Sequence, residues 1–482
     1  MLRDAPLEIQ GRVYHPTSSV IKQLQVTRQT LWRWRKRGLI PPGHSLPNRR
    51  VYYTDAEVEK IWAYCRQVEQ NAVINQISLF EESSINIKND SSLSETDIYL
   101  DNNATTQTLK SVRQGMMKNL EEGFGNPSSS HSRGSKVREA VFLARKNVAE
   151  LVGTEPENII FTSGATESNN MVLRSFADPS TDHIITTAIE HSSIAKPCNY
   201  LESQGVRLSR MNVTAEGRLN VAELEQILLT EKPTLVALHW VNSETGVIQP
   251  IEEIARLCRA HKVPLLCDAA QAVGRIPIEL DMVDVDFLTA SAHKFHGPPG
   301  VGILATKSSQ LIKSLVLGGD QESAMRPGTE NVPGIVGLGI AADERNKSLV
   351  EISCEISELR DSFERKIIER LPFVKVNGDI NNRVCNTSNL QFTGIDGQVL
   401  LAQFNSAGIY CSQGSACSSA IPEASPVLTA MGLSRDEANS SIRFSFSALN
   451  SKDDVIKAVE RIVEKTLFVK DMTEKLGMTR AS

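Results

Sequence analysis

The sequence lacks long apolar runs, an apolar leader and paired cysteines, and each absence excludes a class of protein. No part of it approaches the ~18 uninterrupted apolar residues that a membrane helix needs, so we expect no membrane association. The N-terminus, MLRDAPLEIQ, carries acids and no apolar segment, so we expect no secretory signal or transit peptide and a cytoplasmic location. The eight cysteines form no CxxC pair, so we expect neither structural disulfides nor a bound metal.

What is present is the composition of a globular protein. The 482 residues are 40 % hydrophobic, 23 % charged and only 5 % aromatic, with a net charge of −5, which excludes disordered and collagen-like chains. At ~150 residues per domain, a chain of this length is expected to hold about three domains.

The charge is distributed unevenly along the chain. Residues 1–70 hold 12 Lys and Arg against 6 Asp and Glu, and three of the four tryptophans, whereas the remaining residues hold 40 against 51. Residues 71–96 are rich in Ser and Asn and show no sustained period, which is typical of a flexible linker. We therefore predict a small basic domain over 1–70 that is tethered to an acidic remainder.

From about Thr96, apolar runs of strand length alternate with amphipathic helical stretches. NIIFTSGA, TLVALHW, VPLLCDAAQ and VDFLTASAHK are examples of the first, and SKVREAVFLARKNVAELVG and IEEIARLCRAHK of the second. Buried strands that alternate with helices predict an α/β domain with a mostly parallel sheet. After about Ser348 a long helical pattern gives way to mixed strand and helix, so we predict a large domain over 97–350 and a small α+β domain over 351–482.

The basic domain contains the stretch SSVIKQLQVTRQTLWRWRKRGLIPP, which predicts two short helices joined by a turn. This stretch, with the basic segment Asn48–Tyr53 after it, resembles a MerR-type or excisionase-type helix-turn-helix with its wing. The resemblance implies double-stranded DNA as a partner, because a basic helix of this size fits the major groove. A docking face for another protein is the alternative role of the same helix. The residues expected at the DNA are Arg28, Gln29, Arg33, Arg35, Lys36 and Arg49.

The clearest chemical signal lies at the ends of two neighbouring apolar strands. Asp268 ends one strand in CDAAQ, and Lys294 follows the next in SAHKFHGP. The two would converge in the crevice at the carboxyl edge of the sheet, where α/β proteins bind ligands. Pyridoxal phosphate needs such a pair, a lysine for a Schiff base and an acid at the pyridine nitrogen. Alone, the pair is also compatible with a capping carboxylate and a solvated amine.

Two further segments supply what this cofactor requires. Thr162–Asn169 follows an apolar strand and opens a helix, so its backbone N–H groups and hydroxyls can hold a phosphate at the positive helix end. His191 follows the strand Ile184–Ile189, which places an imidazole over the same crevice. There it can stack on the cofactor ring and carry protons near neutral pH.

Ten motifs follow one another along the chain: YLDNNATT, FGNPSS, FTSGATESNN, AIEHSS, HWVNSETG, CDAAQAVG, SAHKFHGPPGVG, RPGTEN, SQGSACSSA and SSIRFSFS. From Ile98 to about Val469 the sequence thus resembles the cysteine desulfurases of the NifS/IscS type, fold-type I pyridoxal-phosphate enzymes in the class V aminotransferase group. The resemblance implies a mostly parallel seven-stranded sheet, a small C-terminal domain and a homodimer. It also implies that L-cysteine becomes alanine and that a sulfur-acceptor protein, scaffold or carrier, takes the sulfur from an enzyme-bound persulfide.

The resemblance also implies a role for individual residues. Lys294 looks like the Schiff-base lysine, Asp268 like the partner of the pyridine nitrogen, and Gln271 like a donor to the phenolic oxygen. His191 looks like the stacking acid and base. Cys417 matches the nucleophile that takes the sulfur, and its small polar surroundings predict an exposed, mobile loop. The implied phosphate ligands are Ala165, Thr166, Ser291, His293 and, from the second subunit, Thr329; the implied substrate ligands are Arg443, Ala104 and Thr105.

Ser243 departs from the family pattern, which has VNNExG where this chain has VNSETG. The missing asparagine is expected to bind the phenolic oxygen of the cofactor. Ser243 is therefore the candidate for that place, reaching the oxygen through a water.

Two alternatives to a desulfurase are open at this point. The pyridoxal-phosphate fold could serve a DNA-binding regulator as an amino-acid sensor, or the enzyme could be a selenocysteine lyase or an aminotransferase. Residues 1–70 could also dock a sulfur acceptor and not touch DNA.

Overall fold

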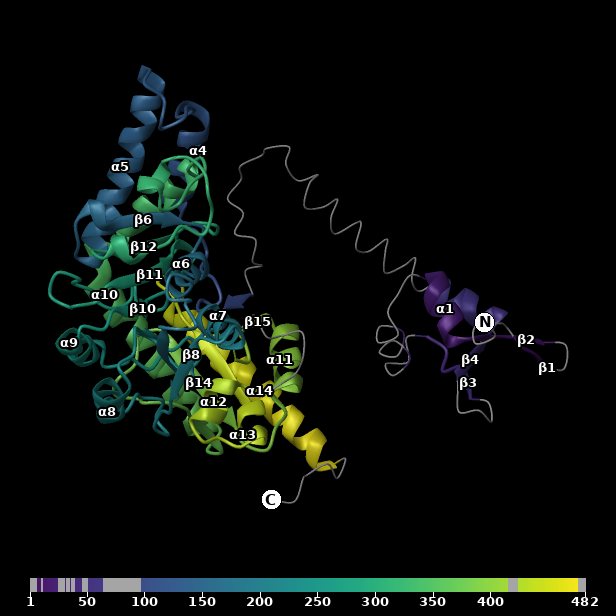
Figure 1. Cartoon of the computed structure of the whole chain (residues 1–482). Helices are drawn as coiled ribbons and strands as arrows, with labels where there is room; N and C mark the ends of the chain where they lie inside the picture. The colour runs from purple at the N-terminus through teal and green to yellow at the C-terminus, as the bar shows by residue number, and fades with distance from the viewer. Residues whose placement is uncertain are drawn as a thin grey trace. The chain divides into compact units, whose positions relative to one another are not determined.

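The structure is a computed structural model that describes residues 7–9, 12–24, 31, 35, 40–45, 51–63, 97–414 and 424–475. The chain divides into two compact units, Met1–Ser92 and Leu93–Ser482 (Figure 1). No helix in the described ranges combines the length and the apolarity needed to cross a membrane.

The first unit packs short helices against a small antiparallel sheet. Its strands are β1 (Leu7–Ile9), β2 (Arg12–Pro16), β3 (His44–Ser45) and β4 (Val51–Thr54), in the order β1-β2-β4-β3. Helix α1 (Thr17–Leu24) follows β2 directly, and residues 55–63 form a further helix after β4. The core of this unit is made by Val20, Leu31, Ile40, Tyr53, Val58 and Ile61. The strands β3 and β4 lie where the sequence predicts the wing, whereas most of the expected second helix lies outside the described residues.

A seven-stranded sheet forms the centre of the second unit. Its order is β6-β12-β11-β10-β9-β7-β8; β12 is antiparallel to both neighbours, and the other pairs are parallel. Every residue of the strands other than the edge strand β8 is buried, which explains why they read as continuous apolar runs. The predicted α/β fold with a mostly parallel sheet is confirmed. The strands are β6 (Ile159–Thr162), β7 (His183–Thr187), β8 (Arg207–Met211), β9 (Leu235–His239), β10 (Leu265–Asp268), β11 (Phe287–Ser291) and β12 (Gly302–Thr306).

Helices cover both faces of this sheet, because alternate strand residues supply two separate hydrophobic clusters. Ile184, Leu235 and Leu266 pack with α6 (Ala165–Leu173) and α7 (Ser192–Ser203). Ile185, Val236 and Cys267 belong to the larger core on the opposite face. The helices that contribute to that core include α4 (Lys110–Glu122), α5 (Ser132–Val152), α8 (Val221–Glu231), α9 (Ile251–His261) and α10 (Val332–Arg370).

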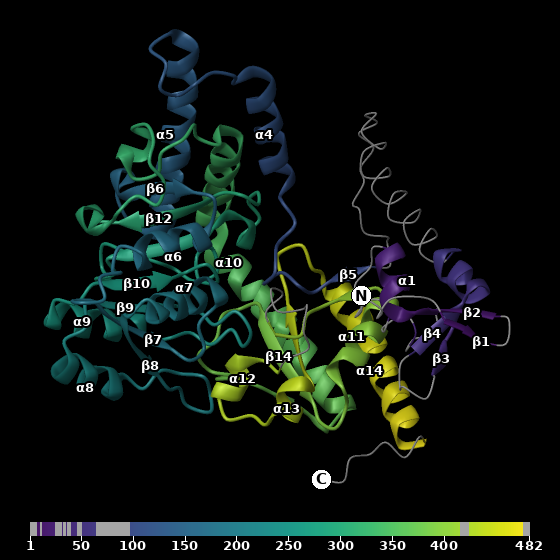
Figure 2. The same ribbon diagram turned by 45° about the vertical axis from the view of Figure 1, so that its right-hand side comes forward.

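The 39-residue helix α10 leads from the large sheet into the small domain (Figure 2). Ser348 has non-helical dihedral angles inside it, close to the domain boundary predicted at residue 350. Beyond α10, an antiparallel sheet has the order β13-β14-β16. The small domain contains β13 (Val374–Val376), β14 (Thr387–Phe392), α11 (Gly397–Ser406), β15 (Ile409–Tyr410), α12 (Pro426–Ala430), α13 (Arg435–Asn439), β16 (Ser441–Ser445) and α14 (Lys452–Lys475).

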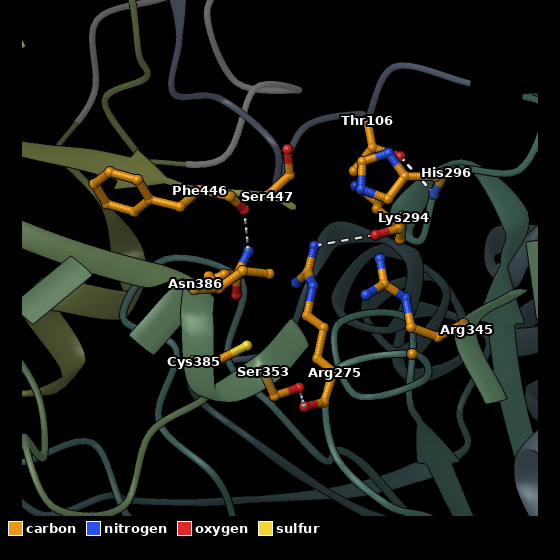
Figure 3. Close-up of a pocket in the computed structure, with 12 residues that line it drawn as sticks. Thr106, Arg275, Lys294, His296, Arg345, Ser353, Cys385, Asn386, Phe446 and Ser447 are labelled. Carbon is orange, nitrogen blue, oxygen red and sulfur yellow. Dashed lines mark hydrogen bonds between the residues drawn. The ribbon is translucent and has the colours of Figure 1, made fainter. Parts of the chain in front are cut away.

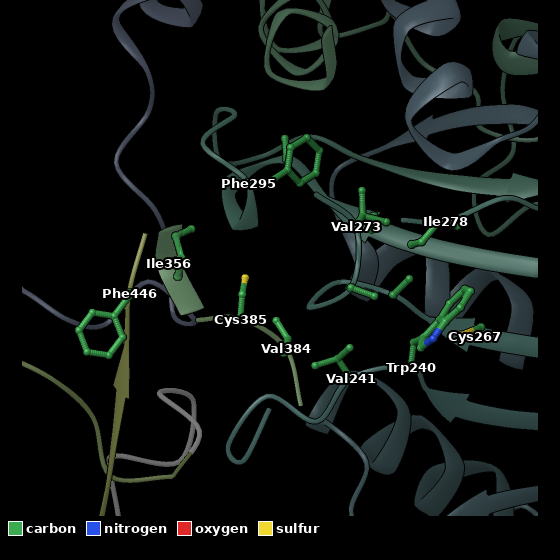
Figure 4. Close-up of a cluster of buried hydrophobic side chains, with 14 of the residues drawn as sticks. Trp240, Val241, Cys267, Val273, Ile278, Phe295, Ile356, Val384, Cys385 and Phe446 are labelled. Atoms are coloured by element: carbon green, nitrogen blue, oxygen red, sulfur yellow. The ribbon is translucent and has the colours of Figure 1, made fainter. Parts of the chain in front are cut away.

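The two parts of the second unit share one hydrophobic core. Figure 4 shows Trp240, Val273 and Phe295 of the large domain in the same cluster as Val384 and Phe446 of the small one. The first strand of the unit, β5 (Ile98–Tyr99), pairs in parallel with β15 of the small domain. The chain between β5 and α4 therefore starts beside the small domain and ends on the large one.

Candidate active site

The carboxyl ends of β9, β10 and β11 open into a cavity of about 200 Å³. This cavity contains most of the cofactor residues that the sequence predicts. The predicted residues that line it are Ala104, Ala165, Thr166, His191, Ser243, Asp268, Gln271, Ser291, His293 and Lys294; His239, Ser193 and Asn242 also line it.

One end of the cavity is formed where β6 turns into α6. The Ala165 N–H donates to Ser291 Oγ at 2.8 Å, which ties the start of α6 to the end of β11. Gly164 and Gly302 approach so closely here that a Cβ on Gly302 would lie 2.5 Å from the Gly164 Cα. The start of α6, with Ala165 and Thr166, thus borders the cavity, and the N-terminus of a helix is a position that binds phosphate.

Lys294 lies in the short helix η2 (Ala292–Lys294), directly after β11. Its Nζ donates to the main-chain oxygens of Asn103 and Ala104, at 2.6 and 2.9 Å. Gln271 Nε2 donates to the same Asn103 oxygen at 3.0 Å. The segment that follows β5 thus holds the amine and the amide side by side.

Asp268 is buried, and both of its carboxylate oxygens accept hydrogen bonds. Oδ2 accepts from Asn169 Nδ2 at 2.8 Å and from Ser193 Oγ at 3.3 Å, and Oδ1 accepts from the Ala270 N–H at 3.0 Å. Thr289 Oγ1 in turn donates to Asn169 Oδ1 at 2.7 Å. The three hydrogen bonds to Asp268 fix the position of its carboxylate at the end of β10, inside the cavity.

His191 caps the start of α7, and its Nδ1 accepts from the Ser193 N–H at 3.1 Å. Burial lowers the pKa of His191, against a smaller opposing effect of Asp268. The ring is therefore neutral near pH 7, and because Nδ1 accepts, Nε2 carries the proton.

A second buried histidine, His239, lines the cavity at the end of β9. Its Nδ1 lies 3.0 Å from Glu190 Oε1, which also accepts from Thr187 Oγ1 at 2.6 Å. Burial lowers the pKa of His239, but Glu190 and Asp268 outweigh it, so the pKa is raised overall. A buried carboxylate and imidazole thus lie in contact beside Asp268.

His293 shares the phosphate end of the cavity. Its Nδ1 lies 3.1 Å from Thr105 Oγ1. Burial and the neighbouring Lys294 lower the pKa of His293 to about 4. It is therefore a neutral hydrogen-bonding group at physiological pH.

Arg443 does not line this cavity. It is buried on β16, where Nη2 donates to Asp101 Oδ1 at 2.7 Å and Nη1 to the Ser243 main-chain oxygen at 3.1 Å. Asp101 Oδ2 also accepts from Ser412 Oγ at 2.8 Å. Of the other two predicted substrate ligands, Ala104 lines the cavity and Thr105 is exposed beside His293.

Several predicted residues lie elsewhere. Thr329 is exposed on the loop before α10 and does not reach the cavity of its own chain. Cys417 lies outside the described residues, as do Arg28, Gln29, Arg33, Lys36 and Arg49. Arg35 lies against the Tyr53 hydroxyl, where its charge counteracts the rise in the pKa of Tyr53 that burial causes.

The sequence did not predict which residues hydrogen-bond the predicted site residues Asp268, Lys294 and Arg443. Asn169, Asn103 and Asp101 all lie within motifs that carry the resemblance, but nothing in the spacing shows what they contact. Ser193 and His239 likewise lie in quoted motifs without an assigned contact. Their position at or shortly after the end of an apolar strand was the only feature of the sequence that could have indicated a role in the site.

The residues present fit pyridoxal phosphate. A lysine amine, a hydrogen-bonded carboxylate, an imidazole and the N-terminus of α6 all border one cavity. The start of α6, beside the close approach of Gly164 and Gly302, is the part of the cavity that would hold the phosphate. Asp268 is the one acidic residue among those that line the cavity, so little negative charge opposes a phosphate there.

Comparison with known proteins gives two family matches. The family model described as aminotransferase class-V matches residues 98–457. The model of the MerR HTH family regulatory proteins matches residues 16–82.

Individual relatives agree with the first match. The chain is 42 % identical over 376 residues to a cysteine desulfurase of Nostoc sp. (strain PCC 7120 / SAG 25.82 / UTEX 2576). The aligned region covers 76 % of this chain and 93 % of the relative. A solved NifS-like protein has 34 % identity and a TM-score of 0.72, over 77 % of this chain and all of its own. A solved structure of SspA in complex with cysteine has 32 % identity and a TM-score of 0.66, over 73 % of this chain and 99 % of its own.

Proposed function

Because the chain belongs to the class-V aminotransferase family and, within it, to the pyridoxal-phosphate-dependent cysteine desulfurases, we propose that it converts L-cysteine to L-alanine and keeps the sulfur as a persulfide on Cys417. The convergence of Lys294, Asp268 and His191 on one cavity is the observation that supports this proposal best. The SspA relative that binds cysteine supports the choice of substrate.

Pyridoxal phosphate, when bound, supplies an electron sink for the electron pair that is left when a bond at the substrate Cα breaks. Lys294 would hold the aldehyde carbon of the cofactor and, when displaced by the substrate amine, move the proton at the substrate Cα. Asp268 would keep the pyridine nitrogen protonated, since its carboxylate is fixed by Asn169 and Ser193. The N–H groups at Ala165 and Thr166, with Ser291 and His293, would hold the phosphate.

The thiol chemistry is assigned to Cys417 and His191. The Cys417 thiolate attacks the substrate sulfur, so an S–S bond forms while the substrate C–S bond breaks and the Cβ gains a proton. His191, with its proton on Nε2, exchanges protons with the two thiols. Alanine then leaves, and a sulfur-acceptor protein, scaffold or carrier, takes the terminal sulfur.

Arg443 is the proposed ligand of the substrate carboxylate. A guanidinium can bind a carboxylate through two parallel hydrogen bonds, and Arg443 already donates one hydrogen bond to the carboxylate of Asp101. The substrate would take the place of Asp101, whose other oxygen keeps Ser412 as a partner. Ser243 presents its main-chain oxygen to Arg443 and its side chain to the cavity.

The N-terminal unit is proposed to bind double-stranded DNA, and the enzyme to act as a homodimer. The MerR match, the excess of basic residues in 1–70 and the strand pair β3–β4 beside α1 support the first proposal. Thr329, exposed and away from its own cavity, supports the second, because a residue in that position is available to a partner subunit. The desulfurase relatives favour this enzyme over an amino-acid sensor.

Exposure of the holoenzyme to one equivalent of cysteine, followed by mass spectrometry of its peptides, tests the sulfur step. We expect one added sulfur atom on the Cys417 peptide and one alanine per subunit. Cys417→Ala should lose both products and keep the cofactor absorbance, whereas the control Cys354→Ala, at an exposed cysteine on α10, should keep both. A keto acid in place of alanine would identify an aminotransferase.

Titration of duplex DNA at several salt concentrations tests the N-terminal unit. Affinity should fall steeply with salt, because Lys and Arg at phosphates release counterions. Lys36→Ala should weaken binding and reduce the salt slope by about one. Lys60→Ala, at an exposed residue on the helix after β4, is the control of equal charge change. A complex with the sulfur acceptor that forms without any DNA affinity would reverse the proposal.

A further inference from the structure

A second, smaller cavity lies behind the segment that carries Lys294. It holds about 20 Å³ of free space (Figure 3), and Lys294 is the one residue that it shares with the lining of the cofactor cavity. We call it the arginine cavity, because the guanidinium groups of Arg275 and Arg345 both point into it. No Asp or Glu lines it. The full lining is Thr106, Gly274, Arg275, Lys294, His296, Arg345, Ser353, Ile356, Cys385, Asn386, Phe446 and Ser447.

Arg275 is buried, and its hydrogen bonds go to neutral oxygens only. Nη2 donates to the main-chain oxygens of Asn102 and Lys294, at 3.4 and 3.3 Å, and Nη1 donates to the main-chain and side-chain oxygens of Gln271. Burial lowers the pKa of Arg275 to about 10, which leaves it fully charged near neutral pH. Its positive charge therefore has no carboxylate partner.

Arg345, on α10, is buried to the same degree. Within the described residues it makes no hydrogen bond and no ion pair, although its Cγ packs close to Gly274. Burial lowers the pKa of this side chain as well. Two guanidinium charges thus share one cavity, and a buried charge is costly unless it is paired.

Cys385 is the one lining side chain that could become an anion. Burial raises the pKa of its thiol, and the opposing effects of Arg275, Arg360 and Arg345 do not cancel the rise. His296 adds no positive charge near neutral pH, since burial lowers its pKa to about 4 and leaves the ring neutral. The lining therefore holds two guanidinium groups and the side chain of Lys294, which also borders the cofactor cavity, and no group that is negative at neutral pH.

We propose that a small monovalent anion of the size of chloride binds in the arginine cavity between Arg275 and Arg345. A cavity of this volume holds one occupant of about the size of a water molecule. Guanidinium N–H groups form short, charge-assisted hydrogen bonds with anions. An anion here would also fix Arg275, which ties together the main chain at Lys294 and the side chain of Gln271 on the cofactor side.

Crystals of the holoenzyme grown in sodium bromide test the site directly. Data collected at the bromine absorption edge should show an anomalous peak between Arg275 and Arg345. A cavity that holds only water gives no such peak, and the absence of a peak together with a melting temperature that does not respond to chloride overturns the proposal.

Thermal unfolding gives an independent measurement in solution. With sodium gluconate replacing sodium chloride at constant ionic strength, the melting temperature should rise with the logarithm of the chloride concentration once chloride exceeds its dissociation constant. Arg345→Met should lose this rise, and Arg345→Lys should keep part of it. A melting temperature of the unchanged protein that does not respond to chloride contradicts the proposal, as does an equal response in Arg345→Met.

Discussion

Asp101→Asn is expected to strengthen the binding of the substrate carboxylate while it destabilises the empty enzyme. In the structure the Arg443 guanidinium donates to Asp101 Oδ1 at 2.7 Å, and both side chains are largely removed from solvent. A substrate carboxylate has to displace Asp101 to reach Arg443. The asparagine keeps an oxygen that can accept the same hydrogen bond, but it carries no charge.

The size of the effect follows from the loss of that charge. Hydrogen bonds to charged groups contribute ~1.5–3 kcal/mol and neutral ones ~0.5–1.5 kcal/mol, so the competing contact weakens by about 1–2 kcal/mol. At 1.4 kcal/mol per tenfold, this is a gain of ~5–30-fold in affinity for a carboxylate that takes its place. The empty enzyme loses the same 1–2 kcal/mol of stability, which lowers the melting temperature of a unit of this size by roughly 1–3 °C.

L-Alanine, the proposed product, is the suitable ligand for the assay, because it carries the carboxylate and no sulfur to transfer. Its dissociation constant is measured from the change in cofactor absorbance, and the melting temperature from circular dichroism. Ser412→Ala is the matched control: it removes a hydrogen bond from the other oxygen of Asp101 and leaves the Arg443 contact in place.

Weaker binding of alanine by Asp101→Asn would refute the reasoning. It would mean that Asp101 orients Arg443 for the substrate and does not compete with it. Arg443→Gln sets the scale, since it removes the guanidinium and should weaken alanine binding by far more than either variant.

Three further predictions follow from other contacts of the site. Gly302→Ala should prevent cofactor retention, because the new Cβ would lie 2.4 Å from the Ala290 main-chain oxygen and block the approach of α6. Retention is measured by absorbance after gel filtration. Gly300→Ala is the control, since a Cβ there meets no atom, although the positive φ adds some strain. His296 has its pKa lowered to about 4 and is unprotonated in the folded protein, so stability should fall as the pH drops from 6.5 towards 4, and the melting temperature of His296→Asn should depend less on pH in that range. Glu190 raises the pKa of His239, so the protonated ring stabilises the fold fully below about pH 6.5 and loses that effect as the pH rises through its folded pKa. The difference in melting temperature between the unchanged protein and His239→Gln should therefore shrink between pH 6 and pH 9. A constant difference would mean that His239 stays neutral.

The sequence predicted the large sheet and the cofactor side of the site because both depend on short stretches of chain. An apolar run followed by Asp268 or Lys294 marks a strand and the residue at its carboxyl end, and parallel strands bring such ends together. The contact of Asn169 with Asp268 was not predicted. Asn169 Nδ2 donates to Asp268 Oδ2 at 2.8 Å, a shorter hydrogen bond than that of Ser193 Oγ to the same oxygen at 3.3 Å. It lies 99 positions away in the chain, and a helix residue that faces inward looks the same in the sequence as one that packs in the core.

The substrate side was harder to predict for a related reason, since it is made by one segment that joins both domains. β5 pairs with β15, Asp101 binds Arg443, and the Asn103 main-chain oxygen accepts from both Lys294 and Gln271. The motif YLDNNATT therefore connects the small domain, which carries Arg443, to the large one, which carries Lys294. Each of these contacts spans more than 150 positions of the chain, so no local pattern encodes it. A displacement of this segment would move Arg443 and Lys294 relative to each other, and this gives a physical reason for its polar residues to be buried and fully hydrogen-bonded at Asn102 and Asn103.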